Sequence, residues 1–192
     1  IASCLVGSEM CIRDRNSRNF WCNVKGIGSW SLTGHSAEEL SKKFTEMQDD
    51  SEVTAGFMWQ KTTRESKKYQ LRGEILSFIP VDKNVEIMLV TITNTGRMAQ
   101  TVTPTAAIPL YGRSADNIRD HRHVTSLLHR IETTDTGVLV TPTLSFDERG
   151  HQVNHMTYYC VGWSGNGEKP VDFYPTAEDF VGEGGNFERP YA

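Results

Sequence analysis

From residue 53 onward, short apolar runs alternate with polar, turn-forming stretches. The runs expected to form strands cover residues 53–60, 69–79, 85–93, 101–111, 123–133, 138–146 and 154–163. The clearest is residues 85–93, VEIMLVTIT, which is dense in β-branched side chains with apolar residues on both faces of its middle. Short strands at this spacing, without long helices between them, predict an all-β fold built as an antiparallel β-sandwich.

Turn chemistry separates several of these runs. The tripeptides DTG at residues 135–137 and ERG at residues 148–150 predict hairpins, because Asp and Gly favour tight turns between strands. The charged residues 61–68 predict a turn between the first two strands. Pro104 and Pro109 lack a backbone N–H, so their run belongs at a sheet edge or at a bulge.

One helix is expected before the strands. Ser36 followed by Glu39 has the spacing of a capping box, which satisfies backbone donors at a helix start. Apolar residues then recur at four- and three-residue intervals, at Leu40, Phe44 and Met47. This spacing predicts a short N-terminal helix whose apolar stripe packs on a sheet. Residues 16–34 are rich in Gly, Ser and Trp without a clean period, and the pattern predicts no element there.

A second, weaker helix start lies near the C-terminal end, at Thr176 and Asp179. The glycine-rich segment 182–186, GEGGN, follows it. Backbone amides of such a segment can bind phosphate, but this one lacks the Lys-Ser/Thr ending of a P-loop. A linker or a tight turn is the favoured interpretation.

Composition and charge exclude several classes of protein. The formal net charge is −4, the pI is about 5.9, and the 20 Lys and Arg residues form no sustained basic block. A nucleic-acid partner is therefore not expected. No apolar run approaches the roughly 18 residues that a membrane-spanning helix needs, so a soluble protein without a membrane partner is expected.

Four cysteines, Cys4, Cys11, Cys22 and Cys160, form no C-x-x-C pair and match no zinc-finger spacing. Reduced thiols in a cytosolic protein are expected. Residues 1–15, IASCLVGSEMCIRDR, lack the charged start of a secretory signal and resemble a translated sequencing adaptor. They are expected to be a non-native extension, which removes Cys4 and Cys11 from the fold.

The densest group of candidate binding residues lies between two predicted strands, in residues 111–130. The substrate-binding candidates are Arg113, Asn117, Arg119, Asp120 and His123. Arginine can hold a carboxylate or phosphate with two hydrogen bonds, and Asp and Asn suit sugar hydroxyls. Loops between strands often carry such groups. The alternative is a solvated loop whose charges pair with one another.

A metal site in the same segment would use His121 and His123, with Asp116 or Asp120 adding oxygen. The interleaved arginines disfavour a cation, and no third ligand is fixed, so no metal is expected. Four tryptophans offer surfaces on which sugar rings could stack, although tryptophans in a sandwich mostly fill the core. They are Trp21, Trp30, Trp59 and Trp163.

Three stretches carry a family resemblance: PTAAIPLYGRSADNIRDHRHVTSLLHRI at residues 104–131, PTLSFDERGH at 142–151 and VGEGGNF at 181–187. They resemble the N-terminal region of glycoside hydrolase family 94 phosphorylases, formerly glycosyltransferase family 36. The 1,2-β-oligoglucan phosphorylase group is closer than cellobiose phosphorylase. The resemblance covers roughly residues 57–186.

This resemblance implies a galactose-mutarotase-like β-supersandwich, a helical linker and an (α/α)6 catalytic barrel in the parent enzyme. Such enzymes cleave a β-glucosidic bond with inorganic phosphate as co-substrate, without a cofactor, and invert the anomeric centre to give α-D-glucose 1-phosphate. The general acid is an Asp of the barrel. Residues 16–192 are then a partial N-terminal sandwich domain without catalytic residues, expected in a cytoplasmic homodimer.

Two other interpretations stay open. A free-standing carbohydrate-binding β-sandwich would have exposed aromatic residues in a flat row. A purely structural domain would leave the polar loop solvated.

Overall fold

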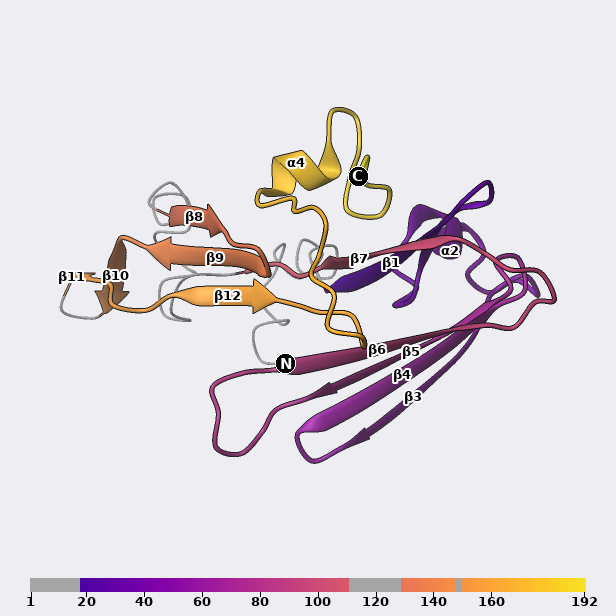
Figure 1. Cartoon of the computed structure of the whole chain (residues 1–192), viewed down its shortest axis with the longest axis horizontal. Coiled ribbons are helices and arrows are strands. Elements are labelled where there is room, and N and C mark those ends of the chain that lie inside the picture. The colour runs from indigo at the N-terminus through magenta and orange to yellow at the C-terminus, as the bar shows by residue number, and fades with distance from the viewer. Residues whose placement is uncertain (1–17, 111–128, 148–149) are drawn as a thin grey trace. The chain divides into compact units, whose positions relative to one another are not determined.

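A computed structural model describes residues 18–110, 129–147 and 150–192 of the chain (Figure 1). The chain forms two compact units, residues 1–107 with 187–189 and residues 108–186 with 190–192. Every strand pairing in the described part is antiparallel, and the helices described are two of five residues each. The expected all-β, antiparallel class with a short N-terminal helix is confirmed.

One sheet of the first unit contains β1 (Asn19–Val24), β2 (Gly28–Ser31) and β7 (Val102–Ala107), in the order β2-β1-β7. Residues 16–34, for which the sequence predicts no element, thus supply two strands. Pro104 lies opposite Cys22 on the edge strand β7, as its missing N–H requires.

The other sheet of this unit is a four-stranded meander. Its strands are β3 (Asp50–Gly56), β4 (Trp59–Ser66), β5 (Leu71–Phe78) and β6 (Ile87–Asn94), hydrogen-bonded in chain order (Figure 1). The turn expected at residues 61–68 is wrong, because most of this stretch belongs to β4. The β3–β4 turn instead lies at Phe57 and Met58, apolar residues that carry no turn signature.

Side chains from both sheets form one buried cluster. Its members are Cys22, Val24, Trp30, Leu32, Tyr69, Leu71 and Ile75. Partly buried Met88, Val90 and Ile92 of β6 pack against it. Burial of each large apolar side chain stabilises the fold by about 1.5–3 kcal/mol. The first unit is therefore a two-sheet sandwich, as predicted.

The first helix is shorter than its predicted stripe. Ser36 Oγ accepts a hydrogen bond from Glu39 N, so the predicted start is confirmed, but α2 (Ala37–Ser41) then ends. Phe44 has φ = 66°, a left-handed conformation that an α-helix cannot contain, and its side chain is 91% exposed. Met47 is also exposed. The expected packing of Phe44 and Met47 on a sheet is therefore wrong.

The second unit contains a three-stranded sheet of β8 (His129–Thr133), β9 (Gly137–Pro142) and β12 (Tyr158–Val161), in the order β12-β9-β8. The turn predicted at residues 135–137 lies between β8 and β9, where Thr134 N donates to Gly137 O at 2.8 Å.

A separate hairpin of this unit pairs β10 (Leu144–Asp147) with β11 (Gly150–Val153). The helix α4 (Ala177–Val181) begins at the predicted Thr176, whose Oγ1 accepts from Asp179 N. Within the described ranges, neither helix has the length or apolar character that crossing a membrane requires.

Candidate functional site

The five predicted substrate-binding residues follow β7 and precede β8 in the sequence. Arg113, Asn117, Arg119, Asp120 and His123, together with Asp116 and His121 of the alternative metal site, lie outside the described residues. Their role therefore stays a prediction. In the part of the chain that the structure does describe, no group of three His, Cys, Asp or Glu side chains is placed to hold a metal ion.

The four tryptophans fall into two pairs. Trp21 and Trp30 are buried, as is usual in a sandwich. Trp59 and Trp163 keep 40% and 60% of their surface exposed. The hypothesis that tryptophans stack on sugar rings is therefore restricted to the second pair.

The glycine-rich tail is a turn. Gly182 ends α4 with φ = 69°, and its N–H donates to Glu178 O at 2.9 Å. A Cβ at this position would lie 2.5 Å from Cβ of Tyr191, so the close approach of the returning chain also requires glycine. This geometry favours the tight-turn interpretation over a phosphate loop.

Two described cysteines are free thiols. Cys22 is fully buried, and burial raises the pKa of its thiol to about 12. Burial also raises the pKa of Cys160. A thiol must ionise to act as a nucleophile or as a metal ligand, so these two residues are suited to packing rather than to chemistry.

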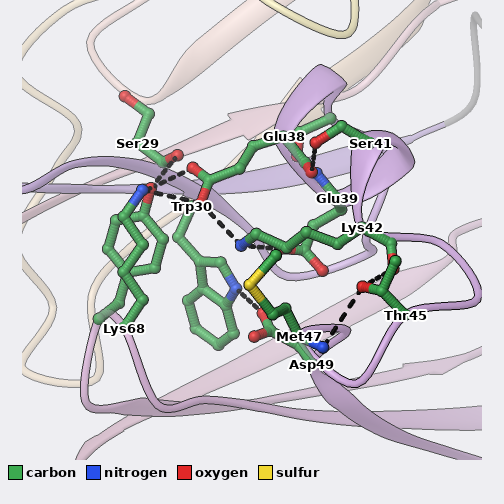
Figure 2. Close-up of polar contacts among 12 residues, drawn as sticks. Ser29, Trp30, Glu38, Glu39, Ser41, Lys42, Thr45, Met47, Asp49 and Lys68 are labelled. Atoms are coloured by element: carbon green, nitrogen blue, oxygen red, sulfur yellow. Dashed lines mark hydrogen bonds and ion pairs between the residues drawn. The ribbon is translucent and has the colours of Figure 1, made fainter.

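Among the described residues, a group of charged and polar side chains surrounds Glu38 on α2 (Figure 2). Its Oε1 accepts from Lys42 Nζ and Lys68 Nζ, both at 2.7 Å, and its Oε2 accepts from Tyr69 Oη at 2.8 Å. Tyr69 Oη lies 3.1 Å from the backbone oxygen of Ser29, which ties the cluster to β2.

These contacts fix the charge of Glu38. Partial burial opposes ionisation, but the hydrogen bonds from Lys42, Lys68 and Tyr69 outweigh it and lower the pKa to about 2. A carboxyl with this pKa is ionised at neutral pH and cannot donate a proton as a general acid. The role of the Glu38 cluster is therefore structural, because its hydrogen bonds hold α2 against the sandwich.

The outer face of the β3–β6 sheet, opposite the core, changes from apolar to charged along the strands. Four rows of residues cross this face, each running from β3 to β6. The first two rows are Gly56, Trp59, Phe78 and Ile87, and then Thr54, Lys61, Leu76 and Leu89. The next two rows are Glu52, Thr63, Glu74 and Thr91, and then Asp50, Glu65, Arg72 and Thr93. We call these sixteen residues the graded face.

At the apolar end, Trp59 is seated against a glycine of the neighbouring strand. A Cβ on Gly56 would lie 2.3 Å from Nε1 and 2.6 Å from Cε2 of Trp59, so the indole occupies the space that a side chain would fill. Phe78 lies directly opposite Trp59 on the other side. The result is an exposed aromatic surface held on a regular sheet.

Further along the same strands, Glu74 joins two cations. Its Oε2 lies 3.2 Å from Lys61 Nζ, and its Oε1 accepts from Arg72 at 2.9 Å. The hydrogen bond from Lys61, followed by that from Arg72, lowers the pKa of Glu74. Lys61 and Arg72 remain about half exposed, so both retain donors that face solvent.

A smaller exposed row lies in the second unit. Tyr159 and Val161 alternate on β12, an edge strand of the three-stranded sheet, and Trp163 follows two residues later. All three are exposed. They are less well fixed than the graded face, because Trp163 lies beyond the end of the strand.

Sequence reasoning missed the graded face because it placed a turn at residues 61–68. With β4 assigned instead, Trp59, Lys61 and Thr63 share one face by their two-residue period. The alternation of polar side chains in WQKTTRES is the signal that could have revealed this strand.

A model of the glycosyl hydrolase 94 supersandwich domain matches residues 7–192 of the chain. No curated protein matches the chain significantly.

Proposed function

The chain belongs to glycosyl hydrolase family 94, and on that premise we propose that it is the supersandwich region of a β-glucan phosphorylase acting on disaccharides or oligosaccharides. In the parent enzyme, an oxygen of inorganic phosphate bonds to the anomeric carbon as the glucosidic bond breaks. The leaving sugar oxygen takes a proton from an Asp of the catalytic barrel. The product is α-D-glucose 1-phosphate, with the anomeric centre inverted.

The family match over nearly the whole chain carries this proposal. The two-sheet sandwich of the first unit agrees with a scaffold role. The free thiols of Cys22 and Cys160 agree with a cytoplasmic enzyme.

The decisive experiment uses the complete reading frame that contains this chain. The encoded protein is incubated with inorganic phosphate and β-1,2-, β-1,3- or β-1,4-linked gluco-oligosaccharides, and sugar phosphates are followed by NMR. Release of α-D-glucose 1-phosphate from one linkage is expected, with the isolated 192-residue chain as an inactive control. No phosphorolysis of any linkage, or activity of the isolated chain, would contradict the proposal.

The region also supplies a homodimer interface and a loop that contacts substrate. The loop contains Arg113, Asn117, Arg119, Asp120 and His123. Alanine at Arg119 in the full enzyme is expected to lower the phosphorolysis rate or weaken the dimer, as measured by kinetics and sedimentation. The matched control is Arg130→Ala, an exposed arginine on β8. Equal behaviour of the two variants would remove Arg119 from this role.

A free-standing carbohydrate-binding module is the second candidate. The exposed Trp59 and the row of Tyr159 and Trp163 favour it, because exposed aromatic side chains on sheets suit stacking of sugar rings. A reading frame that encodes no catalytic barrel, with glucan binding but no phosphorolysis, would establish this alternative.

A further inference from the structure

The graded face combines an exposed indole with polar side chains on one rigid sheet. We propose that this face binds a β-glucan chain, with a pyranose ring stacked on Trp59 and neighbouring hydroxyls bound by Lys61, Glu74 and Arg72. The choice of a glucan as ligand rests on the proposed function. The binding itself is a separate property of this surface.

Trp59 provides the platform for stacking. Gly56 allows the indole to settle directly on β3, while 40% of the residue stays exposed. The Nε1 and Cε2 edge of the indole lies over Gly56, which fixes the ring on the sheet and leaves the exposed part of the ring for stacking. An aromatic ring with an apolar face and a polar edge suits a pyranose, which has apolar C–H faces and polar edges.

The polar residues lie at a suitable distance from the platform. Lys61 follows Trp59 by two residues on the same face, which corresponds to about 6.6–6.8 Å along the strand. Glu74 orients both Lys61 and Arg72, at 3.2 and 2.9 Å, before any ligand arrives. Each cation has donors beyond the one that Glu74 engages, so sugar hydroxyls can be bound without breaking this network.

Charge on the graded face distinguishes a glycan from other ligands. Its acidic residues are Asp50, Glu52, Glu65 and Glu74, and its basic residues are Lys61 and Arg72. Four negative against two positive charges disfavour phosphate-rich partners, whereas a neutral polyhydroxyl chain is not repelled. An ion-pair network in the middle of the face also disfavours a protein partner, because charged residues are depleted from the cores of protein interfaces.

The test measures binding of cello- and sophoro-oligosaccharides to the complete 192-residue chain by isothermal titration calorimetry. Trp59→Ala is expected to weaken binding at least tenfold, or about 1.4 kcal/mol. Gly56→Ala is expected to weaken binding several-fold, since the new Cβ displaces the indole. Far-ultraviolet circular dichroism and the midpoint of thermal unfolding establish that each variant is folded.

Two matched variants act as controls. Phe44→Ala removes an exposed aromatic side chain that has no part in the graded face, and Gly73→Ala adds a Cβ on the opposite face of the same sheet. Both are expected to retain wild-type affinity. Absence of binding by the wild-type chain, or an equal loss in Phe44→Ala, would overturn the proposal. The proposal would also be overturned if Trp59→Ala changed the sedimentation of the chain but left its affinity for glucans unchanged, because the face would then be a protein interface.

The outcome separates this inference from the proposed function. If the complete enzyme releases α-D-glucose 1-phosphate but the chain does not bind glucans through Trp59, only this inference fails. If Trp59-dependent binding is found without phosphorolysis in the complete enzyme, only the phosphorylase proposal fails.

Discussion

The indole N–H of Trp30 donates a 2.8 Å hydrogen bond to Oδ2 of Asp49, nineteen residues further along the chain. Trp30 is 1% exposed and stacks on Tyr69, with ring centroids 6.2 Å apart. This contact joins β2 to the segment that leads into β3, so it couples the two sheets of the sandwich.

Replacement of Trp30 tests the contribution of this contact to stability. Trp30→Ala is expected to lower the free energy of unfolding by about 3–5 kcal/mol, because it leaves a cavity in the core. Asp49→Ala is expected to cost less, about 1–3 kcal/mol, since it removes only the acceptor of the indole N–H. Urea denaturation followed by circular dichroism measures both. A loss in Asp49→Ala equal to that in Trp30→Ala would show that the hydrogen bond, rather than packing, dominates.

The Glu38 cluster predicts a defined dependence of stability on pH. The pKa of Glu38 is lowered from 4.5 to about 2 in the folded chain, so its stabilising contribution is present above about pH 4.5 and is lost as the pH falls toward 2. Glu38→Gln removes the charge but keeps the size of the side chain. The difference in unfolding free energy between wild type and this variant is expected to be about 1 kcal/mol at pH 7 and to shrink below pH 4.5.

Urea denaturation of the two proteins between pH 7 and pH 2.5 measures this difference. Glu178→Gln is a suitable control, because this glutamate also lies in the first turn of a short helix and shows no comparable cluster among the described side-chain contacts. The ionisation of Glu38 would not be the cause if the difference in unfolding free energy between wild type and Glu38→Gln stayed constant from pH 7 to pH 2.5.

The predictability of the fold differs from segment to segment for physical reasons. The helix starts at Ser36 and Thr176 depend on side chains three residues apart, and local sequence was sufficient to predict them. The end of α2 was not predictable, because Leu40, Phe44 and Met47 have helical spacing but Phe44 adopts φ = 66°. The turn at Phe57 and Met58 has no Gly, Asn or Pro, so pairing along β3 and β4 determines its position.

The same reasoning applies to the candidate sites. The candidate substrate-binding residues between β7 and β8 are predicted from residue density alone and lie outside the described residues. The graded face depends instead on cross-strand register: Trp59, Phe78 and Ile87 are distant in sequence and become neighbours only when three strands pair. Register is a tertiary property that a single sequence specifies weakly when its turns lack characteristic residues.

Thiol reactivity tests the packing of Cys22. Burial raises its pKa to about 12, so the thiolate that reacts with alkylating reagents is nearly absent at pH 8. Cys22 is expected to remain unmodified by iodoacetamide in the folded chain and to react fully in 6 M guanidinium, as determined by peptide mass spectrometry. Rapid modification of Cys22 under native conditions would contradict its place in the core.

Gly73 and Leu32 provide the sharpest test of the sandwich itself. A Cβ on Gly73 would lie 2.5 Å from both Cγ and Cδ2 of Leu32, a fully buried residue of the core cluster. Gly73→Ala is therefore expected to lower the free energy of unfolding by about 1–3 kcal/mol through overpacking. Leu32→Ala alone is expected to cost about 2–5 kcal/mol by opening a cavity.

The double variant decides whether the two effects share one space. In Gly73→Ala/Leu32→Ala, the new methyl group enters the volume that Leu32 has left. The penalty of Gly73→Ala is then expected to disappear, which gives a coupling free energy of at least about 1 kcal/mol in a double-mutant cycle. Gly56→Ala is the matched comparison for Gly73→Ala. Its Cβ would also meet a side chain, the indole of Trp59, but on the outer face, where that side chain can move away. Additive losses in the double variant would mean that β5 does not pack against the chain at Leu32.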